Sequence, residues 1–162
     1  MNTLTSNIIE INENDFNEKV IEASKSTLLL VDFWAPWCGP CKQLTPLLEK
    51  VIQKTGNKVI LAKINIDDNQ QIAAQLRIQS IPAVFAFKNG QPVDAFQGVI
   101  PENKIIEFIE KSLGEKLTKD HSSFYQSVQT LISNNEFVQA IELLETFVAE
   151  NPEEFQSLSL YL

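Results

Sequence analysis

Apolar residues along the first two thirds of the chain form short runs that alternate with stripes at helical spacing. Residues 28–34 form an almost unbroken apolar run, which indicates a buried strand, and the residues after Cys38 carry apolar side chains at helical spacing. A hairpin is indicated where two apolar runs, 82–88 and 92–96, flank Asn89-Gly90. The other predicted elements are strands at 8–11 and 59–66, a helix from a capping box at 15–18, a short helix at 72–76, and a helix from Pro101 closed by Gly114. This order predicts an α/β fold with a mixed central sheet flanked by helices.

The pattern changes after Gly114. Residues 115–162 contain eight acidic and two basic residues, so they carry −6 of the chain's net charge of −8. We predict a first domain at 6–114, a polar linker at 115–123 and a helical hairpin at 124–162. One apolar stripe of the hairpin contains Phe124, Val128, Leu131 and Ile132, the second contains Phe137, Ala140, Ile141, Leu144 and Val148, and a third begins with Phe155, Leu158, Tyr161 and Leu162.

Composition narrows the class of protein. The chain has 162 residues, of which 44% are hydrophobic and 21% charged, as is ordinary for a globular protein. Its net charge of −8 argues against nucleic acid or an anionic membrane as a partner, because phosphate binding needs clustered Lys and Arg. No apolar stretch is long enough to span a bilayer, and Met1 to Asn12 lack the basic and apolar segments of a secretory signal. If Met1 is the native start, a cytoplasmic location is expected.

The only two cysteines, Cys38 and Cys41, lie two residues apart between the predicted strand and helix. The first sulfur is therefore expected at a helix N-terminus, where unpaired N–H groups and the macrodipole favour a negative charge. This lowers the pKa of a thiol, and the thiolate is the form that attacks disulfides. The pair is thus suited to thiol–disulfide exchange.

Two other uses of the cysteine pair fit less well. A structural zinc site normally needs four ligands, but the only histidine, His121, is distant in sequence and there is no second cysteine pair. A purely structural disulfide across two residues would close too small a loop to stabilise the chain much, and a reducing cytosol disfavours it. We therefore predict no metal and no cofactor beyond the cysteine pair itself.

Several separated features of residues 6–114 occur in a characteristic order, namely Asp32, the segment Trp34-Ala35-Pro36-Trp37-Cys38-Gly39-Pro40-Cys41-Lys42, Lys63, Ile81-Pro82 and Gly98. With these features, residues 6–114 resemble a thioredoxin domain along their full length. The resemblance implies a thioredoxin fold and a reductase of protein disulfides, recharged by a thioredoxin reductase. The Gly-Pro pair between the cysteines is typical of the reducing members of the family.

The resemblance also implies roles for the matching residues. Cys38 would be an exposed nucleophile that forms a mixed disulfide, and Cys41 would resolve it. Asp32 would lie buried beneath the cysteines with a raised pKa and take a proton from Cys41, with Lys63 as the nearby cation. The alternatives are a surface carboxylate for Asp32 and a solvated edge residue for Lys63.

Substrate would bind beside the cysteines. Gly39 would allow close backbone approach, Pro40 would stiffen the helix start, and Pro82 would be a cis proline facing the sulfurs. The main chain at Ile81 would pair with an extended substrate segment. The resemblance implies that Gly98 belongs to the same surface. Trp34 and Trp37 are both explained as packing residues, but the position of Trp37 beside the nucleophile favours a substrate-facing rim.

The tail resembles a tetratricopeptide repeat in its spacing. The matching positions are Phe124, Leu131, Ala140, Leu144 and Pro152, whereas Val128 stands in place of the usual glycine and Phe147 in place of the usual alanine. A thioredoxin domain followed by such a repeat resembles the bacterial chaperedoxins, which would imply unfolded client proteins and folding chaperones as partners. Since one repeat cannot bury its own apolar face, the tail either docks elsewhere or belongs to a longer array. The remaining alternative is a stabilising extension without a partner.

Overall fold

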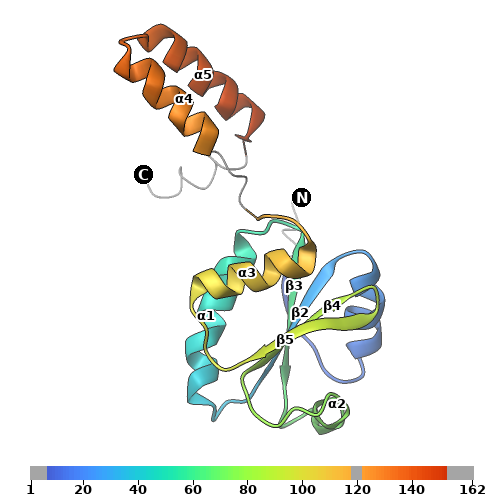
Figure 1. Cartoon of the computed structure of the whole chain (residues 1–162). Helices are drawn as coiled ribbons and strands as arrows, with labels where there is room; N and C mark the ends of the chain where they lie inside the picture. The colour runs from blue at the N-terminus through green and yellow to red at the C-terminus, as the bar shows by residue number, and fades with distance from the viewer. Residues whose placement is uncertain (1–6, 118–121, 153–162) are drawn as a thin grey trace, which may run out of the picture. The chain divides into compact units, whose positions relative to one another are not determined.

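The apolar run at 28–34 forms the central strand of a five-stranded sheet in the computed structural model, which describes residues 7–117 and 122–152 (Figure 1). The strands are β1 (Ile8–Glu10), β2 (Leu28–Trp34), β3 (Val59–Asn65), β4 (Ala83–Lys88) and β5 (Gln91–Gln97). Their order in the sheet is β1-β3-β2-β4-β5. β1 and β2 both run parallel to β3, whereas β4 runs antiparallel to β2 and β5. The predicted mixed sheet is confirmed.

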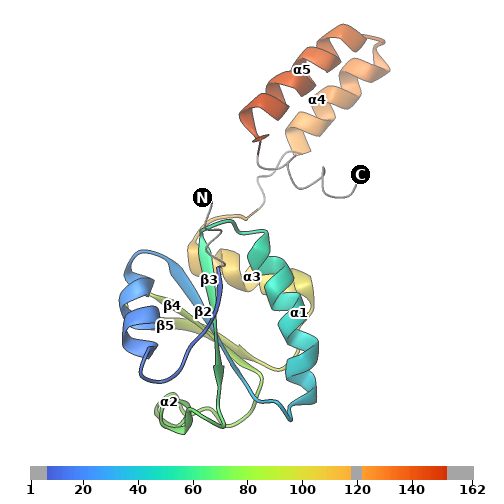
Figure 2. The same ribbon diagram turned by 180° about the vertical axis from the view of Figure 1, so that it is seen from behind.

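Helices cover both faces of this sheet (Figure 2). On one side lie α1 (Gly39–Gln53) and α3 (Glu102–Leu113), and on the other lie α2 (Gln70–Gln75), a π-helix η1 (Asn17–Glu22) and a 3₁₀-helix η2 (Ala23–Lys25). The α3 helix ends at Gly114, as predicted, because the left-handed φ of 80° there favours glycine. The α/β fold class is therefore confirmed.

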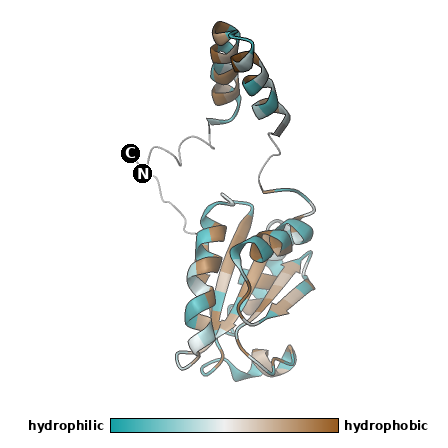
Figure 3. Cartoon of the chain, turned by 60° about the vertical axis from the view of Figure 1, so that its left-hand side comes forward, coloured by the Kyte–Doolittle hydropathy of each residue, from teal (hydrophilic) through white to brown (hydrophobic). Residues whose placement is uncertain are grey.

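Successive side chains of β2 point to opposite faces of the sheet and pack in two separate hydrophobic cores. Leu28 and Leu30 pack with α1 and α3, whereas Leu29, Val31 and Phe33 pack on the opposite face. Successive side chains of a strand point to opposite faces, so Asp32 belongs to the α1 face. The sheet strands are largely hydrophobic in Figure 3, as expected for strands covered on both sides. A carboxyl group is thus inserted into an otherwise apolar layer.

The capping box predicted at 15–18 is wrong. The Asp15 carboxylate accepts from the backbone N–H of Asn12 instead of capping the next turn, and the Asn12 side chain accepts from the N–H groups of Asn14 and Asp15. The reciprocal bonds between Asn12 and Asp15 have the pattern of a capping box that lies three residues earlier than predicted. The helical segment begins at Asn17, without a side-chain cap.

The second unit contains the predicted pair of helices, α4 (Ser122–Ser133) and α5 (Phe137–Glu150), joined through Asn135 at a φ of 60°. Val128, Ala140 and Phe147 are buried between them, and the rings of Phe124 and Phe147 stack at 3.8 Å between centroids. The expected apolar stripe on α5 is present, and as expected for one pair of helices it is not buried by the pair alone. Four of its members remain exposed, namely Phe137, Ile141, Leu144 and Val148.

The reason lies in the geometry of a two-helix unit. A helix that packs on one neighbour buries one side only, and on α5 this side is the line of Ala140 and Phe147, seven residues apart. The expected third stripe at 155–162 and part of the predicted linker, 118–121, lie outside the described residues, as does His121.

Candidate active site

The two cysteines lie where β2 passes into α1. Cys38 is the N-cap of α1 in an extended conformation, and its Sγ accepts a hydrogen bond from the backbone N–H of Cys41 at 3.2 Å. The sulfurs are joined as a disulfide, with the Cα atoms 5.3 Å apart. The first sulfur thus lies at the positive end of a helix, next to a backbone donor that would stabilise its thiolate.

The expectation that Cys38 is exposed is wrong for this disulfide form. Cys38 is 4% exposed and Cys41 is 2% exposed, because Trp34, Ile66 and Ile81 pack around the pair. Access is therefore restricted at both sulfurs.

Gly39 and Pro40 occupy the first turn of α1, where the missing N–H of Pro40 leaves no helical bond unmade. A Cβ atom at Gly39 would meet nothing within 4 Å. No contact within the described residues explains this glycine. The close approach predicted at Gly39 would have to involve another molecule.

Ile81 and Pro82 lie in the segment before β4. The Ile81-Pro82 bond is cis, and Ile81 packs against the cysteine cluster. The carbonyl of Pro82 accepts from the N–H of Gly98 at 2.9 Å, and Gly98 has a left-handed φ of 79°. Gly98 therefore fixes the loop that carries Ile81 and Pro82, a relation that the sequence did not indicate.

Trp37 lies beside the nucleophile with 67% of its surface exposed, so the packing interpretation does not apply to it. Its Nε1–H donates to both carboxylate oxygens of Asp67, at 3.1 Å each. Asp67 was not among the predicted site residues, and thirty positions separate it from Trp37. In contrast, Trp34 is half-buried, and its Nε1 has no hydrogen-bond partner within the described residues.

Asp32 is fully buried, which rules out the surface alternative. Neither carboxyl oxygen has a hydrogen-bond partner among the described residues. Burial raises the pKa of Asp32 from its ordinary value of 3.8 to about 7, the charge of Lys63 opposes this rise, and the charge of Glu49 adds to it. Near neutral pH the carboxyl group can thus both accept and release a proton.

Lys63 is the nearby cation that the resemblance implied, because its charge lowers the pKa of Asp32, but within the described residues it donates no hydrogen bond to that carboxyl group. The two residues are register partners on β3 and β2, but the Lys63 ammonium pairs with Glu49 at 3.2 Å and with Glu10 at 3.7 Å. The Lys63 side chain is 17% exposed, so the solvated alternative is wrong. Glu10 and Glu49 are partners that the sequence did not reveal.

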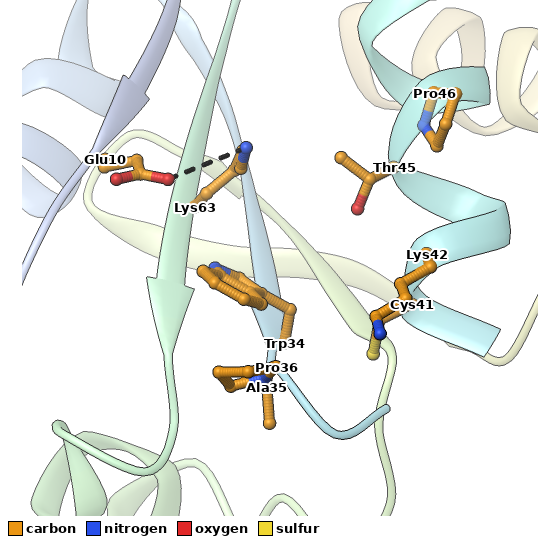
Figure 4. Close-up of a pocket in the computed structure, with 9 residues that line it drawn as sticks. All are labelled: Glu10, Trp34, Ala35, Pro36, Cys41, Lys42, Thr45, Pro46 and Lys63. Atoms are coloured by element: carbon orange, nitrogen blue, oxygen red, sulfur yellow. Dashed lines mark ion pairs between the residues drawn. The ribbon is translucent and has the colours of Figure 1, made fainter. Parts of the chain in front are cut away.

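A cavity of about 290 Å³ lies beside this network, between α1 and the sheet (Figure 4). Cys41, Lys42 and Thr45 of α1 line it on one side, and Trp34 and Lys63 line it on the other. Its walls are mostly apolar, and Cys41 is the cysteine that borders it. The cavity therefore brings the inner cysteine and Lys63 to the walls of one space between α1 and the sheet.

Within 7–117 and 122–152, no group of three or more His, Cys, Asp or Glu side chains is placed to hold a metal ion. No described helix is long and apolar enough to cross a membrane. The chemistry available at the site is that of two thiols, one buried carboxyl group and one ammonium group.

Comparison with known proteins agrees with this chemistry. Residues 7–111 match the family model described as Thioredoxin. Thioredoxin from Haemophilus influenzae is 40% identical over 108 residues, which cover 67% of this chain and 99% of that protein. Thioredoxin 1 from a Nostoc species is 38% identical over 104 residues, or 64% of this chain and 95% of the relative. A thioredoxin from Staphylococcus aureus is 40% identical over 106 residues, or 65% and 98%.

The similarity spans the sheet, its helices and the cysteine pair. The redox-active group is a disulfide of the chain itself, between Cys38 and Cys41. The chain belongs to the thioredoxin family and is a thiol–disulfide oxidoreductase.

Proposed function

We propose that this chain is a reductant of protein disulfides that acts through a Cys38/Cys41 dithiol. Membership of the thioredoxin family implies disulfide-containing substrates and a thioredoxin reductase that recharges the pair. The observation that carries the proposal is the position of Cys38 Sγ at the N-terminus of α1, accepting from the N–H of Cys41. These donors stabilise the Cys38 thiolate, the species that attacks a disulfide.

The reaction proceeds in two exchanges. The Cys38 thiolate attacks one sulfur of the substrate disulfide, so that a Cys38–substrate bond forms and the other substrate sulfur leaves as a thiolate. Asp32 accepts the proton of Cys41, and the Cys41 thiolate then attacks Cys38 Sγ. This forms the Cys38–Cys41 disulfide and releases the second substrate thiolate. The substrate gains two electrons from the dithiol, and its two thiolates take up protons, one returned by Asp32 and one from water.

Substrate binds, in this proposal, as an extended segment along the main chain of Ile81, next to Pro82 and Gly98. Packing of Ile81 against the cysteines supports this placement. The exposed indole of Trp37 and the open space above Gly39, followed by Pro40, form the adjoining surface. The mixed disulfide would thus be held between the start of α1 and the loop before β4.

Insulin reduction tests the function. The wild type should precipitate insulin in the presence of a reductant, Cys38→Ser should be inactive, and Cys41→Ser should accumulate a mixed disulfide that mass spectrometry detects. Equilibration with glutathione buffers should give a reduction potential of about −270 mV for the Cys38/Cys41 pair. This is the value known for thioredoxin itself. Strong periplasmic oxidants have a reduction potential of about −120 mV. A similar potential here would show that the pair oxidises its substrates, contrary to the proposal.

A second candidate function is that of a redox-linked co-chaperone in the cytoplasm, which holds unfolded clients and passes them to folding chaperones. The exposed apolar face of α5 favours it, because Ile141, Leu144 and Val148 line a shallow groove. The tetratricopeptide-like spacing is supported by the buried Ala140 and by the stacking of Phe124 on Phe147, which occupies the place of the usual alanine. Such a face is of the kind that binds apolar segments.

The holding function can be tested without removing the tail. Suppression of aggregation of a cysteine-free client should fall in the full-length Leu144→Glu variant and stay unchanged in Gln139→Glu, an exposed polar position on the same helix. Circular dichroism checks that both variants keep their helices. Equal suppression by both variants would remove α5 as the client-binding element.

A further inference from the structure

The ion pairs of Lys63 are arranged in an unexpected way. Lys63 is the register partner of Asp32, and both side chains belong to the α1 face of the sheet, so the ammonium group could approach the buried carboxyl group. Its Nζ instead lies 3.2 Å from Glu49 Oε1 and 3.7 Å from Glu10 Oε1. The Asp32 oxygens are left without a hydrogen bond among the described residues.

Glu49 is placed for this contact by the helix that carries the cysteines. Cys41, Thr45 and Glu49 follow each other at intervals of four along α1 and therefore lie on one face of it. Figure 4 shows Cys41 and Thr45 of this face on the side of the cavity opposite Lys63. Glu49 is 35% exposed in its side chain, whereas Glu10 is 73% exposed and makes the longer contact. Glu49 is thus the better anchored of the two anions.

We propose that Glu49 is a positioning residue that holds the Lys63 ammonium away from Asp32, and so leaves the buried carboxyl group without a cationic partner and able to accept a proton from Cys41. The inference rests on the proposed role of Asp32 as the proton acceptor, and it adds Glu49 as the residue that keeps the Lys63 ammonium from pairing with the Asp32 carboxyl group. Glu10 assists from β1 through the longer contact.

The charged groups around Asp32 act in two directions. From β3 the Lys63 charge favours the ionised carboxyl group, and from α1 the Glu49 charge disfavours it. Lys42 of α1 lines the neighbouring cavity, Glu10 approaches from β1, and the β4 register partner, Val84, is apolar. Removing the charge of Glu49 therefore has two consequences, both of which lower the pKa of Asp32. A repelling charge is lost, and Lys63 is released toward Asp32.

The test measures the pKa of Asp32 by NMR titration of its carboxyl carbon in the oxidised full-length protein, so that no catalytic turnover is required. Glu49→Gln should lower this pKa by about one unit, as expected when a cation approaches a buried carboxylate. Glu102→Gln is the matched control, because Glu102 also pairs with two lysines, Lys50 and Lys54. It should leave Asp32 unchanged.

The same substitution made in a Lys63→Met protein separates the loss of the Glu49 charge from the release of Lys63. Since Lys63→Met has no ammonium group to release, Glu49→Gln should lower the pKa of Asp32 there by less than half as much as in the wild type. An equal shift in both backgrounds would overturn the holding role, as would equal Asp32 titrations in Glu49→Gln and Glu102→Gln.

The rate profile gives an independent readout. In Glu49→Gln, the acid limb of insulin reduction should move to lower pH along with the Asp32 titration. If Asp32→Asn turned over insulin at the wild-type rate, the proton-acceptor role would fail. The shift of the Asp32 titration by Glu49 would still be measurable, so the two failures are distinguishable.

Discussion

Replacing Asp32 with asparagine should stabilise the oxidised protein above neutral pH and leave its stability nearly unchanged near pH 4. Asp32 is fully buried without a hydrogen-bond partner in the described structure, and burial raises its pKa from 3.8 to about 7. The folded chain therefore binds the Asp32 proton more tightly than the unfolded chain does. The stability associated with this proton is fully present below about pH 4 and is lost as the pH rises through about 7.

The size of the effect follows from the two pKa values. Raising a pKa from 3.8 to about 7 changes it by about three units, and each unit corresponds to about 1.4 kcal/mol. Ionisation of Asp32 should thus cost the folded state about 4 kcal/mol in total. Asparagine has nearly the same shape but does not ionise, so the variant avoids this cost. The difference between the two proteins should grow from pH 4 and level off above pH 7.

Urea unfolding at pH 4, 6 and 8 measures this difference. The two tryptophans of the chain, Trp34 and Trp37, both lie in the first unit, so their fluorescence reports on the unit that contains Asp32. Parallel stability curves for the wild type and Asp32→Asn across this pH range would refute the reasoning, because they would show that the carboxyl group titrates alike in the folded and unfolded chains.

Three further substitutions test the packing. Ile105→Ala removes a fully buried side chain of α3 and should lower the free energy of unfolding by about 2–5 kcal/mol in urea titrations. Gly114→Ala should cost about 1 kcal/mol in the same assay, because the φ of 80° is unfavourable for alanine although a Cβ atom there would meet nothing within 4 Å. Phe147→Ala removes the ring stacked on Phe124 and should abolish hydrogen-exchange protection in α4 and α5, and full protection would contradict the packing described.

Much of the fold could be predicted because its determinants are local. The run at 28–34 matches β2, whose length and apolar character need no information from elsewhere in the chain. The hairpin at Asn89-Gly90 was predictable for a similar reason, since both residues adopt a positive φ, of 54° and 80°, and these residue types tolerate it best. The cysteine pair at the start of α1 could be located from the same strand-to-helix transition.

The parts that could not be predicted depend on side chains brought together by the fold. The partners of Lys63 come from β1 and α1, and the partner of Trp37 is thirty positions away, so no spacing rule connects them. The low exposure of Cys38 likewise depends on Trp34 and Ile81, which approach from separate segments. The sequence shows which residue types are present, but the contacts of Lys63, Trp37 and Cys38 depend on how the fold places α1 and the loops against the sheet.

The tail illustrates a further limit. Helical periodicity correctly predicted two helices, but it could not tell which apolar positions of α5 face α4. Ala140 and Phe147 do so, while Ile141 and Leu144 remain exposed. When an apolar stripe is wider than the surface that one neighbouring helix covers, periodicity alone cannot show which of its residues are buried.

The central claim is that the N-terminus of α1 stabilises the Cys38 thiolate, and a titration of that thiol tests it most directly. In the reduced protein, the rate of Cys38 alkylation can be followed against pH with Cys41 replaced by serine. We expect the Cys38 thiol to titrate clearly below the value of about 8.5 for free cysteine. A thiol as weakly acidic as free cysteine would contradict the account.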